Sequence, residues 1–268
     1  MVARVLTIAG SDSSGGAGIQ ADLKTFTVFG VYGMTAITAV TAQHTRGVLR
    51  VEVLPVEMVR AQIDAVVEDI GVDAVKTGML ATAEIVRAVA DRVRQHRLTP
   101  LVVDPVMVAQ SGARLLAPEA CDVLKHALLP CATLVTPNLP EAEVLAGHRI
   151  DSRADMQRAA EKIVASGAKA CLVKGGHAQT DTAEDVLFDG TSFRFFASPR
   201  RDTPHTHGTG CQLSAAIAAG LAQGLELFEA VARAKEFIDI AIAHGLPLGK
   251  GKGPANPLAW GKRTGAAS

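Results

Sequence analysis

Short apolar runs rich in β-branched residues alternate along the chain with longer segments whose apolar positions recur every three or four residues. The short runs predict strands at about 5–9, 35–41, 74–77, 101–103, 133–136 and 171–174. The longer segments predict helices at about 17–29, 55–69, 83–95, 118–128 and 153–166. This alternation is typical of an α/β fold in which helices flank a central, mostly parallel sheet.

Two further segments interrupt this alternation. Residues 47–54 and 185–197 alternate in polarity or carry several aromatic side chains, which predicts short β-ribbons that act as a small flap or lid. Residues 208–245 have a mostly helical pattern, so we expect the sheet to be complete before them. Since the sequence shows no tandem repeat or internal linker, we expect residues 1–268 to form a single domain with a flexible tail at 262–268.

The composition narrows the range of partners. Of the 268 residues, 48% are hydrophobic and 20% charged, and 27 basic residues balance 27 acidic ones. Because no basic run is longer than Arg200-Arg201, we expect neither a nucleic-acid nor a membrane-surface partner. The four cysteines are widely spaced and form no Cys-x-x-Cys, which argues for a reducing cytosol and against a zinc site. A cytoplasmic protein is expected, because no apolar run resembles a signal peptide or approaches the roughly 18 residues of a membrane span.

Special residues follow the predicted strands at the point where each strand ends. In chain order they are the loop Gly10–Gly18 with Asp12, then Gln43, Gly78-Met79, Asp104, Asn138 and Gly175-Gly176. The carboxyl ends of parallel strands meet at one edge of the sheet and ligands gather there, so a single ligand cleft is predicted. Two nucleotide-binding motifs do not fit. Gly16-x-Gly18 lies too far from its strand for a dinucleotide fingerprint, and Gly249–Gly253 lacks the spacing of a P-loop.

The segment His207–Cys211 carries the strongest chemical signal. Gly208 and Gly210 flank Thr209 directly before a long Ala-rich segment, which is typical of a loop that turns into a packed helix. The first N–H groups of such a helix have no intrahelical partner, so with the helix dipole they can hold a phosphate or stabilise developing negative charge. Cys211 lies on the first turn, where a thiol ionises more readily than in water. The alternative is a glycine turn before a core helix with a buried cysteine.

A second polar pair lies where a predicted strand passes through a proline turn into a helix. Asn138 and Glu141 are three residues apart, on one face of the start of that helix. An amide beside a carboxylate suits Mg²⁺, which takes few protein ligands and completes its shell with water and phosphate. The alternative is a helix cap with its capping-box acid.

Six segments carry a family resemblance. They are Ala9–Lys24, Lys76–Met79, Asp104–Val106, Thr136–Glu141, Leu172–His177 and Thr206–Cys211. Together they closely resemble the hydroxymethylpyrimidine/phosphomethylpyrimidine kinases of thiamin biosynthesis, which have the ribokinase-like fold. The resemblance runs from about residue 4 to about residue 257, and its most specific part is the first loop combined with the corner that ends in Cys211.

The resemblance implies a kinase that uses ATP and Mg²⁺. It would phosphorylate the hydroxymethyl group of 4-amino-5-hydroxymethyl-2-methylpyrimidine and then, at the same site, the resulting monophosphate. The implied substrate contacts are Gly10, Asp22, Gln43, Met79 and Val106. Such a set is chemically suited to the task, because a carboxylate and an amide can read the edge of an aminopyrimidine while a thioether and a valine pack on its faces.

The resemblance also implies the phosphate side of the site. The implied ATP and phosphate contacts are Asp104, Asn138, Lys174 and His207. Asn138 and Glu141, with Asp104, would organise Mg²⁺ mainly through water. The implied catalytic residues are Gly208, Thr209, Gly210, Cys211 and Lys174. We expect the adenine between residues 185–197 and the helices after Cys211.

Cys211 departs from many sugar and nucleoside kinases of this fold, which have an aspartate as general base at that place. An unperturbed thiol has a pKa of ~8.5, and a helix N-terminus can lower that value into the working range, which makes Cys211 a candidate base. Phosphoryl transfer depends mainly on positioning and charge stabilisation, so a weak base or none would also suffice.

Two other functions stay open at this stage. Some relatives with the same cysteine corner accept the vitamin B6 ring, so a pyridoxal kinase is the nearest rival, although Asp22, Gln43 and Met79 favour the aminopyrimidine. A non-catalytic sensor of the pyrimidine is the third, and the intact Asn138, Glu141 and Lys174 argue against it. Residues 47–54 are a candidate contact for a homodimer.

Overall fold

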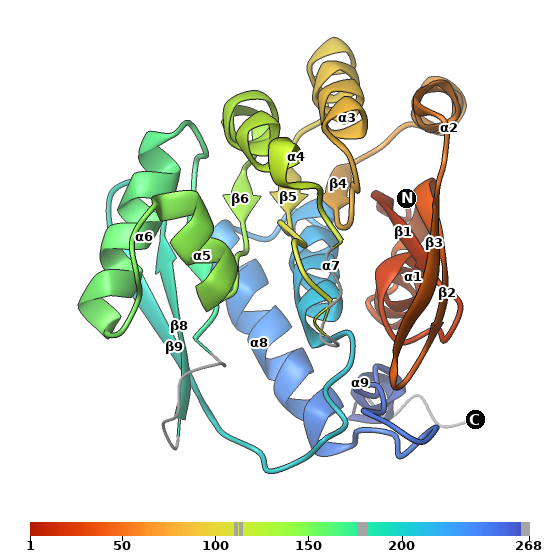
Figure 1. Ribbon diagram of the computed structural model, residues 1–268. Coiled ribbons are helices and arrows are strands. Elements are labelled where there is room, and N and C mark those ends of the chain that lie inside the picture. The colour runs from red at the N-terminus through yellow and green to blue at the C-terminus, as the bar shows by residue number, and fades with distance from the viewer. Residues whose placement is uncertain (110–111, 113–114, 176–181, 264–268) are drawn as a thin grey trace.

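The computed structural model describes residues 1–109, 112, 115–175 and 182–263 (Figure 1). The strands are β1 Arg4–Asp12, β2 Tyr32–His44, β3 Gly47–Val53, β4 Ala74–Thr77, β5 Leu101–Val103, β6 Leu134–Val135, β7 Cys171–Val173, β8 Thr182–Phe188 and β9 Phe193–Pro199. The α-helices are α1 Gly18–Val28, α2 Val56–Asp69, α3 Ala83–Gln95, α4 Pro118–Val123, α5 Leu139–Ala146, α6 Arg153–Ala165, α7 Thr209–Ala222, α8 Leu227–Ala243 and α9 Leu258–Arg263.

The nine strands form one sheet in the order β3-β2-β1-β4-β5-β6-β7-β8-β9. The strands from β2 to β7 in this order pair in parallel, whereas β3, β8 and β9 pair antiparallel to their neighbours. The six predicted strands and the mostly parallel sheet are therefore confirmed. The sheet is also complete before α7, as expected, because the chain after β9 adds only helices to the described structure.

Both predicted β-ribbons are continuous with the edges of the central sheet. Residues 47–53 form β3, which pairs with the second half of β2 at one edge of the sheet. Residues 185–197 lie in the hairpin β8–β9, which extends the sheet at its other edge. As edge strands, both β3 and β9 are only partly covered, which leaves side chains such as Leu49 and Phe195 exposed.

Helices cover both faces of the sheet. Helices α2 to α6 pack on one face, and α1, α7, α8 and α9 pack on the other (Figure 1). The inner strands serve both layers, because Val5 of β1 belongs to the core under α7 and α8 while Leu6 and Ile8 belong to the core under α2 and α3. A strand that is buried on both faces has a continuous run of apolar residues, and this is why the sequence pattern predicted these strands.

The helix boundaries follow local signals. Helix α3 begins where predicted, after Thr82, whose hydroxyl accepts a hydrogen bond from the N–H of Ile85. The predicted helix at 118–128 is α4 followed by a π-helical turn at Leu124–Leu128. Of the predicted tail at 262–268, residues 262 and 263 belong to α9, and residues 264–268 lie outside the described part of the chain.

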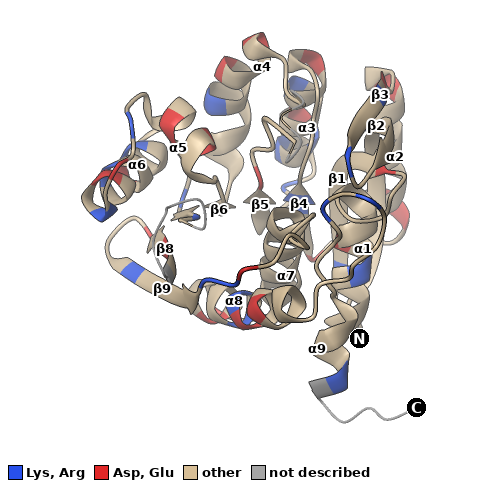
Figure 2. Ribbon diagram, turned by 60° about the horizontal axis from the view of Figure 1, so that its bottom comes forward, with Lys and Arg blue, Asp and Glu red and all other residues tan. Residues whose placement is uncertain are grey.

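Charged residues are interspersed over the helices in the view of Figure 2 rather than gathered by sign. This arrangement agrees with the equal numbers of basic and acidic residues. Within the described ranges, no helix is both long and apolar enough to cross a membrane.

Candidate active site

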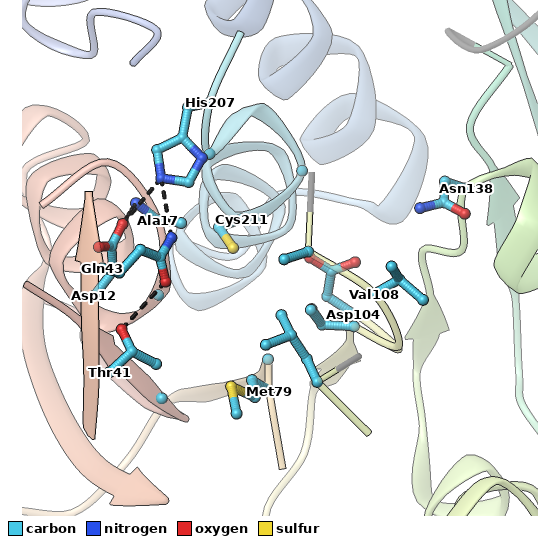
Figure 3. Close-up of a pocket in the computed structure, with 18 of the residues that line it drawn as sticks. Asp12, Ala17, Thr41, Gln43, Met79, Asp104, Val108, Asn138, His207 and Cys211 are labelled. Carbon is cyan, nitrogen blue, oxygen red and sulfur yellow. Dashed lines mark hydrogen bonds and ion pairs between the residues drawn. The ribbon is translucent and has the colours of Figure 1, made fainter. Parts of the chain in front are cut away.

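The carboxyl ends of the parallel strands and the N-terminus of α7 enclose a cavity of about 170 Å³ (Figure 3). The predicted site residues that line it are Gly10, Gln43, Met79, Val106, Asp104, Asn138, Glu141, Lys174, His207, Gly208, Gly210 and Cys211. The structure thus brings together side chains that the sequence separates by up to two hundred positions. Asp22 and Thr209 are the predicted residues that are not part of the described lining.

One end of the cavity is apolar. Met79 packs with Ala39 and Ala81, and Val106 and Leu115 lie against this cluster. A side chain at Gly10 would approach the sulfur of Met79 to 3.1 Å, so glycine leaves room for a flat ligand beside the thioether. The geometry suits the faces of a heteroaromatic ring.

Gln43 borders this apolar end and is held in place by its neighbours. Its Oε1 accepts a hydrogen bond from the Thr41 hydroxyl at 3.1 Å, and its Nε2 lies 3.4 Å from Nε2 of His207 (Figure 3). The same His207 nitrogen lies 3.0 Å from Oδ2 of Asp12. A ring N–H that donates to the Asp12 carboxylate cannot also accept from Gln43, so the Gln43 amide keeps an N–H for a ligand.

Asp12 organises the first loop. Burial alone would raise its pKa, but hydrogen bonds from His207, Ser14 and the N–H of Ala17 outweigh burial and lower the pKa. The carboxylate therefore stays charged and fixes the loop that precedes α1. The sequence predicted the position of Asp12 in this loop but no role for it, and it predicted His207 only as a phosphate contact.

Asp22 lies in a buried ion pair and not in the cavity lining, which differs from its predicted role as a substrate contact. It is fully buried, its oxygens lie 2.8 and 3.0 Å from Nζ of Lys76, and it accepts a hydrogen bond from the Thr7 hydroxyl at 2.6 Å. The predicted contact between Asp22 and the pyrimidine edge does not fit this position, because the carboxylate is committed to a lysine. Lys76, which the sequence analysis did not single out, lines the cavity instead. A lysine inside an apolar strand was the available signal, since such a group needs a buried partner.

The opposite end of the cavity is polar. Nζ of Lys174 lies 3.0 Å from Oδ1 of Asp104, whose oxygens also accept hydrogen bonds from Thr136 at 3.3 Å and Ser214 at 3.2 Å. Burial alone would lower the pKa of Lys174, but the carboxylates of Asp104 and Glu141 outweigh it and raise the pKa. Lys174 therefore carries a permanent positive charge at the end of β7, where a phosphoryl group could meet it.

Asn138 and Glu141 make the capping contacts and also face the cavity. The Asn138 side chain accepts from the N–H of Glu141, and Oε2 of Glu141 accepts from the N–H of Asn138, both at 2.9 Å. Burial raises the pKa of Glu141 to about 7, with Lys174 opposing the rise and Asp104 adding to it. Two carboxylates that lie this close to one cavity disfavour each other's charge, and a divalent cation would relieve that cost.

The oxygen donors fit Mg²⁺ only in part. Among the described residues, no three His, Cys, Asp or Glu side chains gather closely enough to form a metal site. The available set is Asp104, Glu141 and the Asn138 amide, all of which line the cavity. A set this small suits a cation that keeps several waters and takes its remaining ligands from phosphate.

The two glycines of the corner before α7 differ in backbone conformation. Gly208 has the left-handed conformation (φ 78°), and a Cβ there would overlap the carbonyl oxygen of Gly16. Gly210 is not among the glycines with positive φ, and its Cβ position lies 3.4 Å from Nζ of Lys174. The turn therefore requires glycine at 208, whereas glycine at 210 keeps open the space beside the lysine.

The predicted anion hole, meaning the backbone N–H groups of residues 208–211, lacks the N–H of Thr209. Both the N–H and the hydroxyl of Thr209 donate to the carbonyl oxygen of Thr206, at 3.3 and 2.6 Å. Thr209 is thus turned away from the cavity. The N–H groups of Gly210 and Cys211 remain in the first turn of α7, where no intrahelical acceptor precedes them.

The expectation that the helix N-terminus lowers the thiol pKa is wrong. Burial raises the pKa of Cys211 to about 11, and the nearby carboxylates of Asp22 and Asp104 add to the rise while Lys76 opposes it. The helix dipole does not compensate for the loss of water around the sulfur. This raised pKa favours the neutral thiol at neutral pH.

Comparison with known proteins agrees with this geometry. The sequence matches the family described as phosphomethylpyrimidine kinase over residues 12–256. It is 53% identical over 254 residues to the thiamine biosynthesis bifunctional protein ThiED of Geobacter sulfurreducens. That alignment covers 95% of this chain but only 52% of the Geobacter protein, so this chain spans about half the length of that relative. It is 52% identical over 252 residues to the hydroxymethylpyrimidine/phosphomethylpyrimidine kinase of Streptomyces coelicolor, covering 94% and 93% of the two chains.

A solved structure gives the same assignment of fold. The ADP complex of Bacillus subtilis pyridoxal kinase is similar with a TM-score of 0.91 and 44% identity, over 97% of this chain and 98% of that one. The ribokinase-like fold implied by the sequence motifs is therefore confirmed. With the family match over most of its length, the chain belongs to the phosphomethylpyrimidine kinase family.

Proposed function

We propose that this protein transfers a phosphoryl group from ATP to the hydroxymethyl group of 4-amino-5-hydroxymethyl-2-methylpyrimidine, and then to the resulting monophosphate. The observation that carries the proposal is the division of one cavity into an apolar end with an amide and a polar end with a fixed lysine. The pyrimidine ring would lie between Met79 and Val106, with its polar edge at Gln43. Its hydroxymethyl group would point toward Lys174.

In this arrangement the protein acts mainly by positioning and charge. Lys174 and the N–H groups of Gly210 and Cys211 would hold the transferred phosphoryl group, and these donors need no rearrangement as negative charge shifts. Mg²⁺, when bound, would neutralise charge on the phosphates of ATP. Asp104, Asn138 and Glu141 would hold it mainly through water.

One enzyme assay distinguishes the pyrimidine kinase, the pyridoxal kinase and the non-catalytic sensor. Purified protein with ATP and Mg²⁺ should release ADP in the presence of the pyrimidine alcohol, with a higher kcat/KM than for pyridoxal. A higher kcat/KM for pyridoxal would favour the rival kinase, to which the similarity with the Bacillus subtilis structure points. Binding of the pyrimidine without any release of ADP would favour the sensor.

We expect Cys211→Ala to lower kcat by less than about tenfold. A positioned base contributes roughly 10²–10⁴, but a thiol with a pKa of about 11 is almost entirely protonated near pH 7, which removes most of that contribution. The measurement is kcat against pH from 6 to 9, with Cys131→Ala as a control outside the described lining of the cavity. A fall of two orders of magnitude with a changed pH profile would instead identify Cys211 as the general base.

We expect Glu141→Gln to raise the Mg²⁺ concentration needed for half-maximal turnover. Because glutamine keeps only one acceptor for the N–H groups of Asn138 and Met107, the variant should also lose roughly 1–3 kcal/mol of stability. Ser152→Ala is the matched control, since it removes the cap of α6, which is outside the described cavity lining. If Glu141→Gln changed stability alone, as Ser152→Ala should, capping would be its whole role.

We also propose that the edge strand β3 is the contact of a homodimer. Leu49 and Val53 on β3 and Val40 on the adjacent β2 are exposed apolar residues. An exposed apolar edge strand is a template for pairing with another chain. Sedimentation of the purified protein tests this contact.

A further inference from the structure

A buried carboxylate joins three elements behind the polar end of the cavity. Asp185 of β8 is only 3% exposed. Its Oδ1 accepts a hydrogen bond from the N–H of Gly175 at 2.9 Å, and its Oδ2 lies 2.8 Å from Nζ of Lys235 on α8. A buried charge persists only when it is paired and hydrogen-bonded, and here each oxygen has its partner.

The hydrogen bond from Gly175 fixes the backbone next to Lys174. On its other side, the N–H of Lys174 donates to the carbonyl oxygen of Pro137 at 2.8 Å. A Cβ at Gly175 would overlap the carbonyl oxygen of Glu184, so this turn lies directly against the backbone of β8. Two consecutive N–H groups are thus anchored to different elements, and the side chain that leaves between them is Lys174.

We propose that Asp185 and Lys235 are positioning residues for phosphoryl transfer, which hold the turn at Lys174 and Gly175 so that the lysine faces the N-terminus of α7. The proposal rests on the kinase function proposed above. Lys235 belongs to α8, and α8 packs against α7. The ion pair therefore connects the strand end that carries the lysine to the helix pair that carries the anion hole.

The first variant removes the anchor. Asp185→Ala should lower kcat by about 10², because a displacement on the order of 1 Å of a reacting group can cost that much. The KM for the pyrimidine alcohol should stay the same, since Gln43 and Met79 lie at the other end of the cavity. Asp185→Asn keeps an oxygen for the N–H of Gly175 and should retain much more activity than Asp185→Ala.

A pair of variants separates positioning from stability. Lys235→Met leaves the Asp185 charge buried without its cation, and the fall in kcat should be largely reversed in the double variant Asp185→Asn/Lys235→Met, which keeps the hydrogen bond from Gly175. Glu184→Gln is the matched control. It lies next to Asp185 on β8 and loses an ion pair with Arg153, whose side chain is largely exposed, so its kcat should equal that of the wild type.

All assays would be run at 25 °C with the melting temperature of each variant measured in parallel. A kcat of Asp185→Ala near the wild-type value would overturn the proposal, as would equal losses in Asp185→Ala and Asp185→Asn. If Asp185→Ala does not fold, the double variant and Lys235→Met decide the question. The wild-type protein tests the kinase function separately. Each variant is then assayed with whichever alcohol the wild type phosphorylates, the pyrimidine alcohol or pyridoxal.

Discussion

Gly208→Ala will lower kcat by about 10²–10³, the usual cost of losing an oxyanion-type donor. The residue has φ 78°, and a Cβ there would overlap the carbonyl oxygen of Gly16 in the first loop. Either the loop or the first turn of α7 must move to admit the methyl group. Both form part of the cavity wall, because Asp12 and Ala17 of the loop and Gly210 and Cys211 of the turn belong to its lining.

The matched control is Gly224→Ala, two residues after the end of α7. Gly224 has a similar φ of 86°, but a Cβ there meets nothing within 4 Å. Both variants should lose roughly 1–2 kcal/mol from the left-handed conformation, and Gly208→Ala should lose more because of the overlap with Gly16, as measured by urea unfolding. Only Gly208→Ala should lose turnover. If the two variants had equal kcat values, the close contact with the first loop would have no part in forming the anion hole.

Gly208 and Gly210 differ in a backbone conformation that the sequence pattern alone does not determine. The pattern Gly-Thr-Gly before an Ala-rich segment predicted a loop that turns into a helix, and α7 begins at Thr209. Sequence spacing could not show which glycine has a positive φ, because that depends on the approach of the first loop to Gly208. Nor could it show that Thr209 turns toward Thr206 and away from the cavity.

The strands and amphipathic helices were predictable because their signals are local. Helix α3 has a threonine cap and a strong apolar face, and its predicted bounds are those observed. The pairing of β3 with β2, and of β9 with β8, was not predictable in the same way. An edge strand and a free ribbon have the same alternation, and only the register with a partner distinguishes them.

The positions of the site residues were predictable from the sequence, but their pKa values and charge partners were not. Strand ends correctly located Gln43, Asp104 and Lys174 around one cavity. The state of Cys211 depends on burial and on carboxylates from distant parts of the chain, so a rule based on the helix N-terminus gave the wrong direction for its pKa. Asp22 was misplaced for a similar reason, since its buried partner Lys76 lies 54 residues further along the chain.

That buried pair gives the largest expected effect on stability. Lys76 and Asp22 are both fully buried, with Nζ and Oδ2 2.8 Å apart. Lys76→Met should lower the free energy of unfolding by about 3–5 kcal/mol, because it leaves a buried carboxylate without its cation. The double variant Asp22→Leu/Lys76→Met should recover most of this loss. Arg149→Met is the control, since it breaks an exposed ion pair with Asp151 and should cost at most about 1 kcal/mol.

The pH dependence of Lys76→Met provides an independent test. Burial already raises the pKa of Asp22, and Lys76 is the main group that opposes the rise, so removing the lysine should raise this pKa further. An unfolded aspartate has a pKa of about 3.9. Between that value and the raised folded value, the folded variant binds one proton more than the unfolded chain, so its free energy of unfolding must fall as the pH rises. Urea unfolding of Lys76→Met and of the double variant from pH 4 to 8 measures this slope. A slope in Lys76→Met that is absent from the double variant is the expected result, and equal slopes would mean that Asp22 does not carry the buried charge.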